Sequence, residues 1–197
     1  MVQLTFYLAD VQDLVKYNER AKITGYLGKW MWKVAGLRPK ELTAVEIGWT
    51  TKAGRPSLGP TDILVYVTSN VTSIDDDRSV ISANGGDVSQ AIENPKVLGL
   101  TSVDATRQEA LSEVYYGRAL FPREVAGAAF HEAAHNKSLQ GMEMHGKKDG
   151  FLVEVPVFAG DPTEANLEFL ATHVLANVRQ KLVPQNILTS KWYKGGP

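Results

Sequence analysis

Cysteine is absent from this 197-residue sequence. Its absence excludes disulfide bonds, thiolate-bound metals and a cysteine nucleophile, although it does not identify a cellular compartment. A metal site in this chain must therefore use histidine, aspartate and glutamate side chains. The chain is long enough to bury about 70% of its unfolded surface, so we expect one compact domain over residues 1–197 that needs no covalent cross-links.

An excess of charge of one sign and long hydrophobic runs are absent as well. The 21 basic and 22 acidic residues give a net charge of −1 and are interspersed along the chain. Without a basic stripe, neither nucleic acid nor a membrane is an expected partner. No apolar run reaches the about 20 residues that cross a bilayer, and the N-terminal residues show no conventional signal peptide. We expect a cytoplasmic protein by default, with export by a specialised route still open, and the pattern indicates no oligomeric state.

Apolar residues at helical spacing occupy much of the first 40 residues. They predict a helical N-terminal segment that begins at an N-cap Asp10 and ends near Gly36. Gly25 and Gly28 could divide this segment into two helices. Three roles stay open for it, as part of the core, as a lid or as a docking element appended to the domain.

Two β-favouring runs follow, at residues 43–49 and 62–68. The second is almost continuously apolar, which is typical of a strand at the centre of a sheet. The intervening residues 52–60 hold two glycines and two prolines and predict a hairpin loop. Shorter strands are expected at residues 97–100 and 113–116.

Two helices are predicted in the C-terminal half. The first covers residues 122–140 and ends at Gly141, and the second begins at an N-cap Asp161 and runs to about Lys181. An edge strand is expected between them, at residues 151–157. We therefore expect an α+β fold, a mixed twisted sheet packed on the first of these helices, with N-terminal and C-terminal helices beside it.

Three consecutive aspartates at residues 75–77 are the most acidic run of the chain. Their spacing does not match a calcium-binding EF-hand loop, and they predict a solvated turn.

The residues that indicate chemistry are His131-Glu132-Ala133-Ala134-His135, inside the first C-terminal helix. Residues four apart lie on one face of a helix, so His131 and His135 can direct both imidazoles at one metal ion. Glu132 can reach a water on that ion without binding the ion itself. Zinc lowers the pKa of such a water, and a carboxylate can take its proton as it attacks a carbonyl. The pattern therefore predicts a hydrolytic zinc site with Glu132 as general base.

This HExxH pattern resembles the signature of the zincin superfamily of zinc metallopeptidases. The match covers the five motif residues, and about residues 110–175 if the preceding strand and the following helix are included. The resemblance implies a peptidase with Zn²⁺ as cofactor, a third protein ligand and an open fourth position. It also implies a peptide or protein substrate, bound in extended form along a strand that we expect near residues 113–116.

Two zincin patterns suggest different third ligands. In metzincin-like proteins the helix ends at a glycine and a third histidine follows; here His145 follows Gly141, at a longer spacing than HExxHxxGxxH and with no later methionine for the metzincin turn. In thermolysin-like proteins the ligand is a glutamate on a later helix, which Glu168 matches. We predict His131, His135 and His145 as the zinc ligands, with Glu168 as the alternative.

Several other residues and functions stay open. Asp149 and Glu143 are further candidates for the third ligand, and His173 is a candidate for a role beside the site. Tyr115 or Tyr116 could donate a hydrogen bond to a developing oxyanion, although strand packing explains at least one of them. Besides an active peptidase, the pattern allows an amidohydrolase acting on a non-peptide or cell-wall amide, or an inactive binding module that kept the helix.

Overall fold

The computed structural model describes residues 1–10, 12–50, 58–69, 94–104, 109–119, 121–147, 149–153 and 156–182. Within them the chain forms five strands, three α-helices and two 3₁₀ helices. The strands are β1 (Val2–Ala9), β2 (Leu42–Thr50), β3 (Ile63–Thr68), β4 (Gly99–Asp104) and β5 (Glu109–Tyr115). The helices are α1 (Tyr17–Gly36), α4 (Pro122–Ser138), η2 (Met142–Lys147), η3 (Gly150–Leu152) and α5 (Glu164–Gln180).

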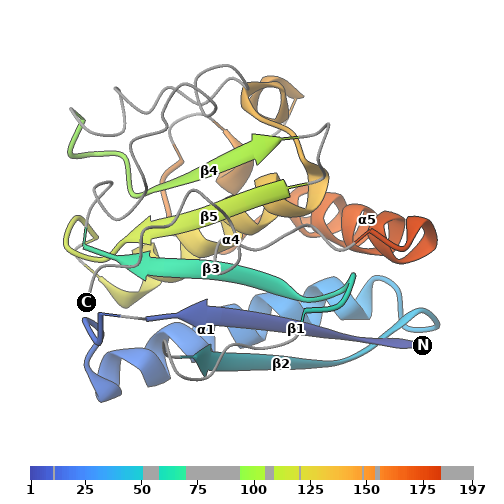
Figure 1. Ribbon diagram of the computed structural model, residues 1–197, viewed down its shortest axis with the longest axis horizontal. Helices are drawn as coiled ribbons and strands as arrows, with labels where there is room; N and C mark the ends of the chain where they lie inside the picture. Colours follow the sequence, from blue (N-terminus) through green and yellow to red (C-terminus); the bar gives the residue numbers. More distant parts are fainter. Residues whose placement is uncertain are drawn as a thin grey trace.

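The strands form one mixed sheet in the order β2-β1-β3-β5-β4 (Figure 1). β1 pairs in parallel with β2 and β3, and β3 pairs in parallel with β5, whereas β4 runs antiparallel to β5. α1 and α4 pack against the sheet and against each other, and α5 contacts both helices. The expected α+β fold with a mixed sheet is therefore confirmed.

Most of the hydrophobic core lies between the sheet and these helices. β3 is buried at every position and lies in the middle of the sheet, as its apolar sequence predicts. Trp30 of α1 is fully buried, and its ring meets those of Phe130 in α4 and Phe151 in η3 edge-on, with centroids 6.3 and 5.3 Å apart. This aromatic contact joins the N-terminal helix to the helix that carries the HExxH motif.

The helical N-terminal segment expected within residues 1–40 is preceded by a strand, over residues 2–9, that was not predicted. These residues form β1 because Leu4, Phe6 and Leu8 alternate with the period of a strand, and all three are fully buried. β1 lies between β2 and β3 and pairs with both, so the predicted hairpin at residues 52–60 is wrong as well. The N-terminal residues are part of the core rather than a lid or an appended element.

α1 is one continuous helix rather than two. Gly25 and Gly28 are tolerated inside it because its apolar face is stabilised by packing on β2, α4 and α5. The helix begins at Tyr17, and Asp10 is not its N-cap. The Asp10 carboxylate instead accepts two backbone amides, each at 2.9 Å, in the turn that precedes the helix.

Residues 151–157 do not form the predicted edge strand where the structure describes them. Gly150–Leu152 is the 3₁₀ helix η3, and Pro156 lies in a loop. The backbone amide of Phe151 donates a hydrogen bond to the side chain of Asn166 in α5 at 2.8 Å, and not to a neighbouring strand.

The C-terminal helices lie close to their predicted bounds, but two of their ends differ: α4 ends at Ser138, before the predicted Gly141, and the start of α5 differs as well. α5 begins after Thr163, whose hydroxyl accepts the amide of Asn166 at 3.3 Å, so Asp161 is not its N-cap. It ends at Gln180, close to the predicted Lys181. Residues 75–77 lie outside the described residues. Among the helices that the structure describes, none has the length and apolar character needed to cross a membrane.

Candidate metal centre

Helix α4 is built to lie close to its neighbours. It begins at Pro122, and the Glu124 side chain caps its first turn. Five of its thirteen buried residues are alanine, and at Gly127 an added Cβ would lie 2.4 Å from ring atoms of Phe158. The helix is closed by Leu139, whose φ of 53° lies in the left-handed region and reverses the chain two residues before Gly141.

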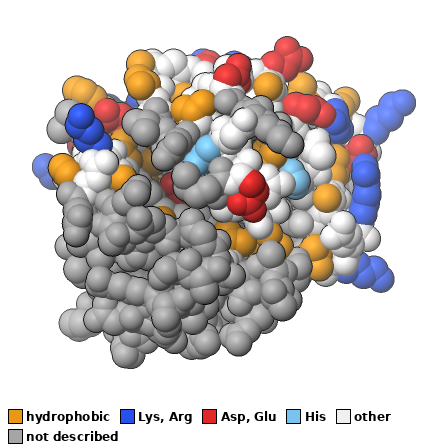
Figure 2. All heavy atoms as spheres, turned by 90° about the horizontal axis from the view of Figure 1, so that it is seen from above, with side chains coloured by type: hydrophobic (Ala, Val, Ile, Leu, Met, Phe, Trp, Pro, Cys, Tyr) orange, Lys and Arg blue, Asp and Glu red, His pale blue; other side chains and the backbone are white. Residues whose placement is uncertain are grey.

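The three histidines predicted as ligands converge on one point. His131 and His135 lie one turn apart on α4, and η2 brings His145 back to face them. Their Nε2 atoms form a triangle with sides of 3.1 Å (His131–His135), 3.0 Å (His135–His145) and 3.2 Å (His131–His145). Figure 2 shows histidine side chains at the surface, with acidic and apolar side chains close by. No second group with ligands so close together occurs in the described ranges.

The size of this triangle fits a tetrahedral zinc ion. Zinc binds imidazole nitrogen at about 2.0–2.1 Å, and tetrahedral angles then place two ligand nitrogens about 3.3–3.4 Å apart. The observed sides of 3.0–3.2 Å differ from that separation by only a few tenths of an ångström. Three protein nitrogens leave the fourth position open, which is the arrangement of catalytic zinc sites rather than of closed structural ones.

Two backbone carbonyls fix the tautomer of the rings on α4. Nδ1 of His131 lies 2.5 Å from the carbonyl oxygen of Phe151, and Nδ1 of His135 lies 2.7 Å from that of Gln140. A carbonyl only accepts, so each Nδ1 carries the proton and each Nε2 presents a lone pair to the centre. Burial lowers the pKa of both rings, that of His135 to about 4, which keeps them neutral near pH 7. Two lone pairs 3.1 Å apart repel each other unless a cation lies between them.

The side chain of Glu132 extends from α4 to β4. The Thr101 hydroxyl donates to its Oε2 at 2.6 Å, and a Cβ at Gly99 would lie 2.7 Å from its Oε1, so a larger residue does not fit there. Burial raises the pKa of the Glu132 carboxyl to about 8; the Thr101 hydrogen bond lowers it and the nearby charge of Glu113 raises it further. A cation at the histidine triangle would favour the ionised form, which is the form a base requires.

A buried polar cluster supports Glu132 from beneath. Thr101 of β4 and Ser112 of β5 face each other at 2.9 Å, and both hydroxyls lie 3.1 Å from the Glu132 carbonyl oxygen. One turn further along α4, Asn136 donates to the Ser112 hydroxyl at 3.3 Å. These contacts fix the position of α4 along the two strands, and with it the position of the Glu132 carboxylate.

The predicted substrate strand near residues 113–116 is wrong. β5 pairs with β3 on one side and β4 on the other, so it has no free edge for an extended substrate, and β4 is the last strand of the described sheet. Tyr115 donates to the buried Glu113 carboxylate, and burial raises the pKa of Tyr115 well above its usual range. Tyr116 donates to Glu19 of α1. Both hydroxyls are thus bound to glutamates rather than directed at the histidines.

The alternative ligands take part in other contacts. Glu168 of α5 forms an ion pair with Arg38. Asp149 accepts a hydroxyl hydrogen bond at 2.8 Å from the residue that caps α5. Glu143 is exposed, and the ring of His173 packs on a phenylalanine one turn away, with centroids 4.4 Å apart. None of these four side chains belongs to the group of converging ligand atoms.

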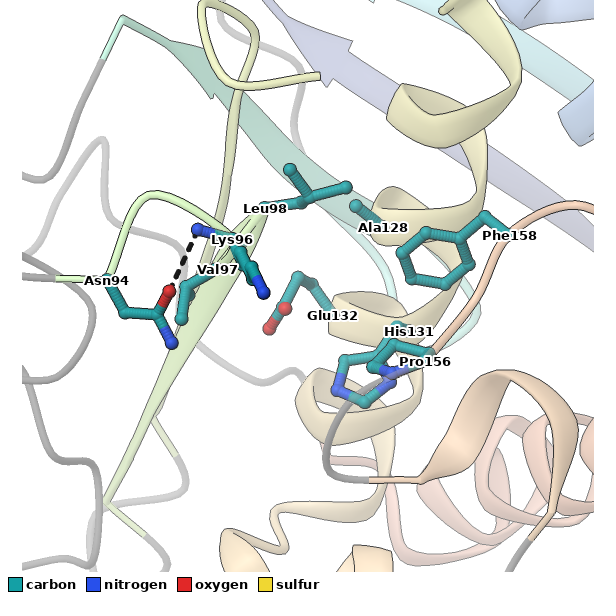
Figure 3. A pocket seen from close by; sticks show the side chains of 10 residues that line it. Asn94, Lys96, Val97, Leu98, Ala128, His131, Glu132, Pro156 and Phe158 are labelled. Atoms are coloured by element: carbon teal, nitrogen blue, oxygen red, sulfur yellow. Dashed lines mark hydrogen bonds between the residues drawn. The ribbon is translucent and has the colours of Figure 1, made fainter. Parts of the chain in front are cut away.

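A cavity of about 290 Å³ opens beside the histidine cluster. His131 and Glu132 line it, and Figure 3 shows Lys96 and Glu132 entering it from opposite sides, with Pro156 and Phe158 at another wall. Its volume is close to the lower end of the range of small-ligand pockets, about 300–1,000 Å³. One predicted ligand and the predicted base therefore line the same concave space.

The residues that support Glu132 are absent from the sequence predictions. Thr101 and Ser112 carry small hydroxyl side chains, and Gly99 has none, so each is ordinary for a strand or its end. The one feature that could have identified Thr101 and Ser112 is that their polar side chains occupy strand positions that face a helix. That feature appears only when the register of the strands against α4 is known.

Comparisons with protein-family models, curated proteins and solved structures found no match for this chain. The centre is therefore interpreted from its own geometry.

Proposed function

We propose that this chain is a zinc-dependent hydrolase that cleaves peptide bonds. The histidine triangle carries the proposal, because three Nε2 atoms lie 3.0–3.2 Å apart on and beside a helix that also holds Glu132. Two of the rings are oriented by backbone carbonyls, the contact that commonly orients metal-binding histidines. The resemblance of the motif to zincins agrees with this interpretation.

Each residue of the centre has a role in such a reaction. His131, His135 and His145 would hold zinc through Nε2. When bound, zinc lowers the pKa of a water molecule and polarises the carbonyl of the substrate. Glu132 takes a proton from the attacking water and delivers it to the nitrogen of the leaving amine. The C–N bond breaks, the oxygen of water joins the carbonyl carbon, and a carboxylic acid and an amine result.

Thr101 is the positioning residue of this mechanism. Its hydroxyl donates a hydrogen bond to Oε2 of Glu132 at 2.6 Å, so that Oε1 is the oxygen that exchanges the proton. Gly99 provides the space in which Oε1 lies. A base held in one orientation needs no rearrangement when it takes the proton from the attacking water, and such preorganisation is a large part of enzymatic rate enhancement.

Zinc content and a Glu132→Gln variant test the proposal together. After zinc loading and dialysis we expect about one zinc ion per chain in both proteins, because Glu132 is not a ligand. The parent should cleave an unstructured protein, and the variant should be slower by about 10²–10⁴-fold, the contribution of a general base. Glu164→Gln is the matched control, since this exposed glutamate at the start of α5 lies outside the cavity.

Each outcome decides a separate part of the proposal. A Glu132→Gln variant as fast as the parent contradicts the role of the base, and a parent that retains no zinc contradicts the metal site. Zinc binding without peptide cleavage contradicts the peptidase. A survey of non-peptide and cell-wall amides then separates an amidohydrolase from an inactive binding module.

A further inference from the structure

A groove of about 1000 Å³ adjoins the cavity beside the histidines. Its size is at the upper end of the range for ligand pockets, about 300–1,000 Å³, whereas the cavity is at the lower end. The two spaces share walls formed by four residues, Lys96, Leu98, Pro156 and Phe158. A ligand seated in the groove therefore extends toward Glu132 and the histidine cluster.

The groove is strongly cationic. Its lining includes the basic residues Lys22, Lys96, Arg118 and Arg123, and Glu124 is the single acid among the described residues that line it. A concave surface with charges of one sign attracts ligands of the opposite sign and repels those of the same sign.

The two arginines hold the walls of the groove together. Arg118 donates to the carbonyl oxygens of Asn94 and Val97, at 3.3 and 3.1 Å, and so anchors the segment before β4. Arg123 donates to the Asp161 carboxylate at 2.9 Å and so anchors the segment before α5. Both guanidinium groups are thus used within the protein.

The two lysines differ from the arginines. Lys22 and Lys96 are exposed, and neither forms an ion pair with an acidic side chain in the ranges that the structure describes. Figure 3 shows Lys96 extending into the cavity that Glu132 also lines. No acid of the described ranges thus competes with a ligand for these two lysines, and Lys96 lines the same cavity as Glu132.

Exposed apolar side chains accompany these lysines. Phe121 is 64% exposed and Val157 is 76% exposed, and both line the groove together with Tyr26. Large apolar side chains exposed in one concave surface are typical of binding sites, because burying them on a ligand is favourable.

We infer that the groove binds a segment of the substrate that carries carboxylate groups together with an aromatic or large aliphatic side chain. A carboxylate of this segment would lie at Lys96, beside the bond that is cleaved. Charge complementarity selects this occupant, since a basic segment would be repelled by Lys22 and Lys96, neither of which pairs with an acid of the described ranges. The inference rests on the proposed function, because it takes the occupant to be the substrate of the zinc centre.

Equilibrium binding tests the groove without turnover. Zinc-loaded Glu132→Gln protein is titrated against fluorescent peptides that share the same phenylalanine and leucine residues but carry either glutamates or lysines. We expect the acidic peptide to bind about tenfold more tightly than the basic one, with the difference shrinking at high salt. Adding Lys96→Glu or Lys22→Glu should weaken acidic-peptide binding about five- to tenfold and strengthen basic-peptide binding.

The matched control is Lys40→Glu, which makes the same charge change at an exposed turn outside the groove and should leave both affinities unchanged. Equal affinity for the two peptides, no measurable binding of the acidic one, or equal effects of Lys96→Glu and Lys40→Glu would overturn the inference. Far-ultraviolet circular dichroism confirms that each variant is folded. Lys96→Gln provides a milder second change if the reversal unfolds the protein.

The experiments distinguish an error in the assignment of the groove from an error in the proposed function. If the parent cleaves acidic and basic peptides with equal kcat/KM, the zinc peptidase stands and the groove assignment is wrong. If the parent retains no zinc and cleaves no peptide, but Lys96→Glu still reverses the binding preference, the proposed function is wrong and the groove is a docking surface for acidic peptides.

Discussion

Two clusters of polar and charged side chains lie toward opposite ends of α4. Near its first turn, Arg123 joins Trp30, Lys29 and Lys33 around the carboxylate of Asp161. Near its last turn, three histidine rings direct their Nε2 atoms at one point. The Asp161 cluster joins residues far apart in the sequence, whereas the histidine cluster lies within residues 131–145, and the two clusters are built on opposite principles.

The clusters differ in whether their donors and acceptors match. Asp161 accepts from four donors at 2.7–3.3 Å, and the hydrogen bond from Lys29 is the main reason that the pKa of its carboxyl lies well below the usual range. The histidine cluster instead brings lone pairs against lone pairs, at least between His131 and His135. A matched cluster stabilises the fold by itself, whereas a cluster of acceptors costs free energy until a cation joins it. The first is structural, and the second has the character of a binding site.

Removal of His145 should have the largest effect, because it should abolish the metal binding that distinguishes the histidine cluster from the Asp161 cluster. In His145→Ala only two nitrogens remain, and we expect zinc content after dialysis to fall from about one ion per chain to almost none. Zinc that binds only the folded protein stabilises it by mass action, by about 4 kcal/mol at a thousand times Kd. EDTA should therefore lower the thermal midpoint of the parent and leave that of His145→Ala unchanged. Glu168→Ala, which removes the partner of Arg38 and of the Thr172 hydroxyl, should respond to EDTA like the parent; the opposite pattern would make Glu168 the ligand.

Replacement of Thr101 should separate metal binding from catalysis within the histidine site. Thr101→Val removes the hydrogen bond to Oε2 of Glu132 and keeps the shape of the side chain, so we expect kcat to fall about 10–100-fold, as for other contacts that orient a centre. Zinc content and KM should stay close to those of the parent. Thr101→Ser restores the hydroxyl and should recover most of the activity. Equal losses in the valine and serine variants would show that packing, not the hydrogen bond, matters at this position.

Replacement of Asp161 should give the smallest effect, on stability alone. Asp161→Asn keeps the shape but removes the charge that four donors share, and we expect the thermal midpoint at pH 7 to fall by about 2–8 °C. A carboxyl with a lowered pKa in the folded state contributes stability above its unfolded pKa, about 3.9, and loses that contribution as the pH falls further. The difference between parent and variant should therefore be constant down to about pH 4 and shrink below it. Thermal melts from pH 7 to pH 2.5 measure it, and a change in zinc content would contradict the division between the clusters.

The convergence of the three histidines was predictable because these residues are close together in the sequence. His131 and His135 need only the geometry of a helix to face one point, and His145 follows soon after the helix ends. The contact of Thr101 with Glu132 spans 31 residues and depends on how β4 and α4 are aligned, which no local pattern encodes. Sequence reasoning therefore predicted the cluster of three histidines and the proposed role of Glu132, but not the contact with Thr101 that holds the Glu132 carboxylate.

The errors in the predicted fold also arise from contacts between residues far apart in the sequence. The alternation of Leu4, Phe6 and Leu8 is visible in the sequence, but the longer helical pattern that follows it dominated the prediction. Parallel pairing of β1 with strands on both sides involves residues far apart in the chain, so it leaves no turn signal. At Asp161, a strong local preference for helix capping lost to ion pairs with α1, 128 and 132 residues away in sequence.

The order in which the chain folds should differ for the metal site and for its base. All three ligand nitrogens come from residues 131–145, and a short loop closes with little loss of chain entropy. The contact that holds Glu132 must wait until β4 has paired with β5 and both have docked on α4, and such non-local pairing is slow. If the proposed function holds, a chain that has formed only α4 and η2 would bring the three histidines together before Glu132 is held in place. Metal binding would then precede activity during folding.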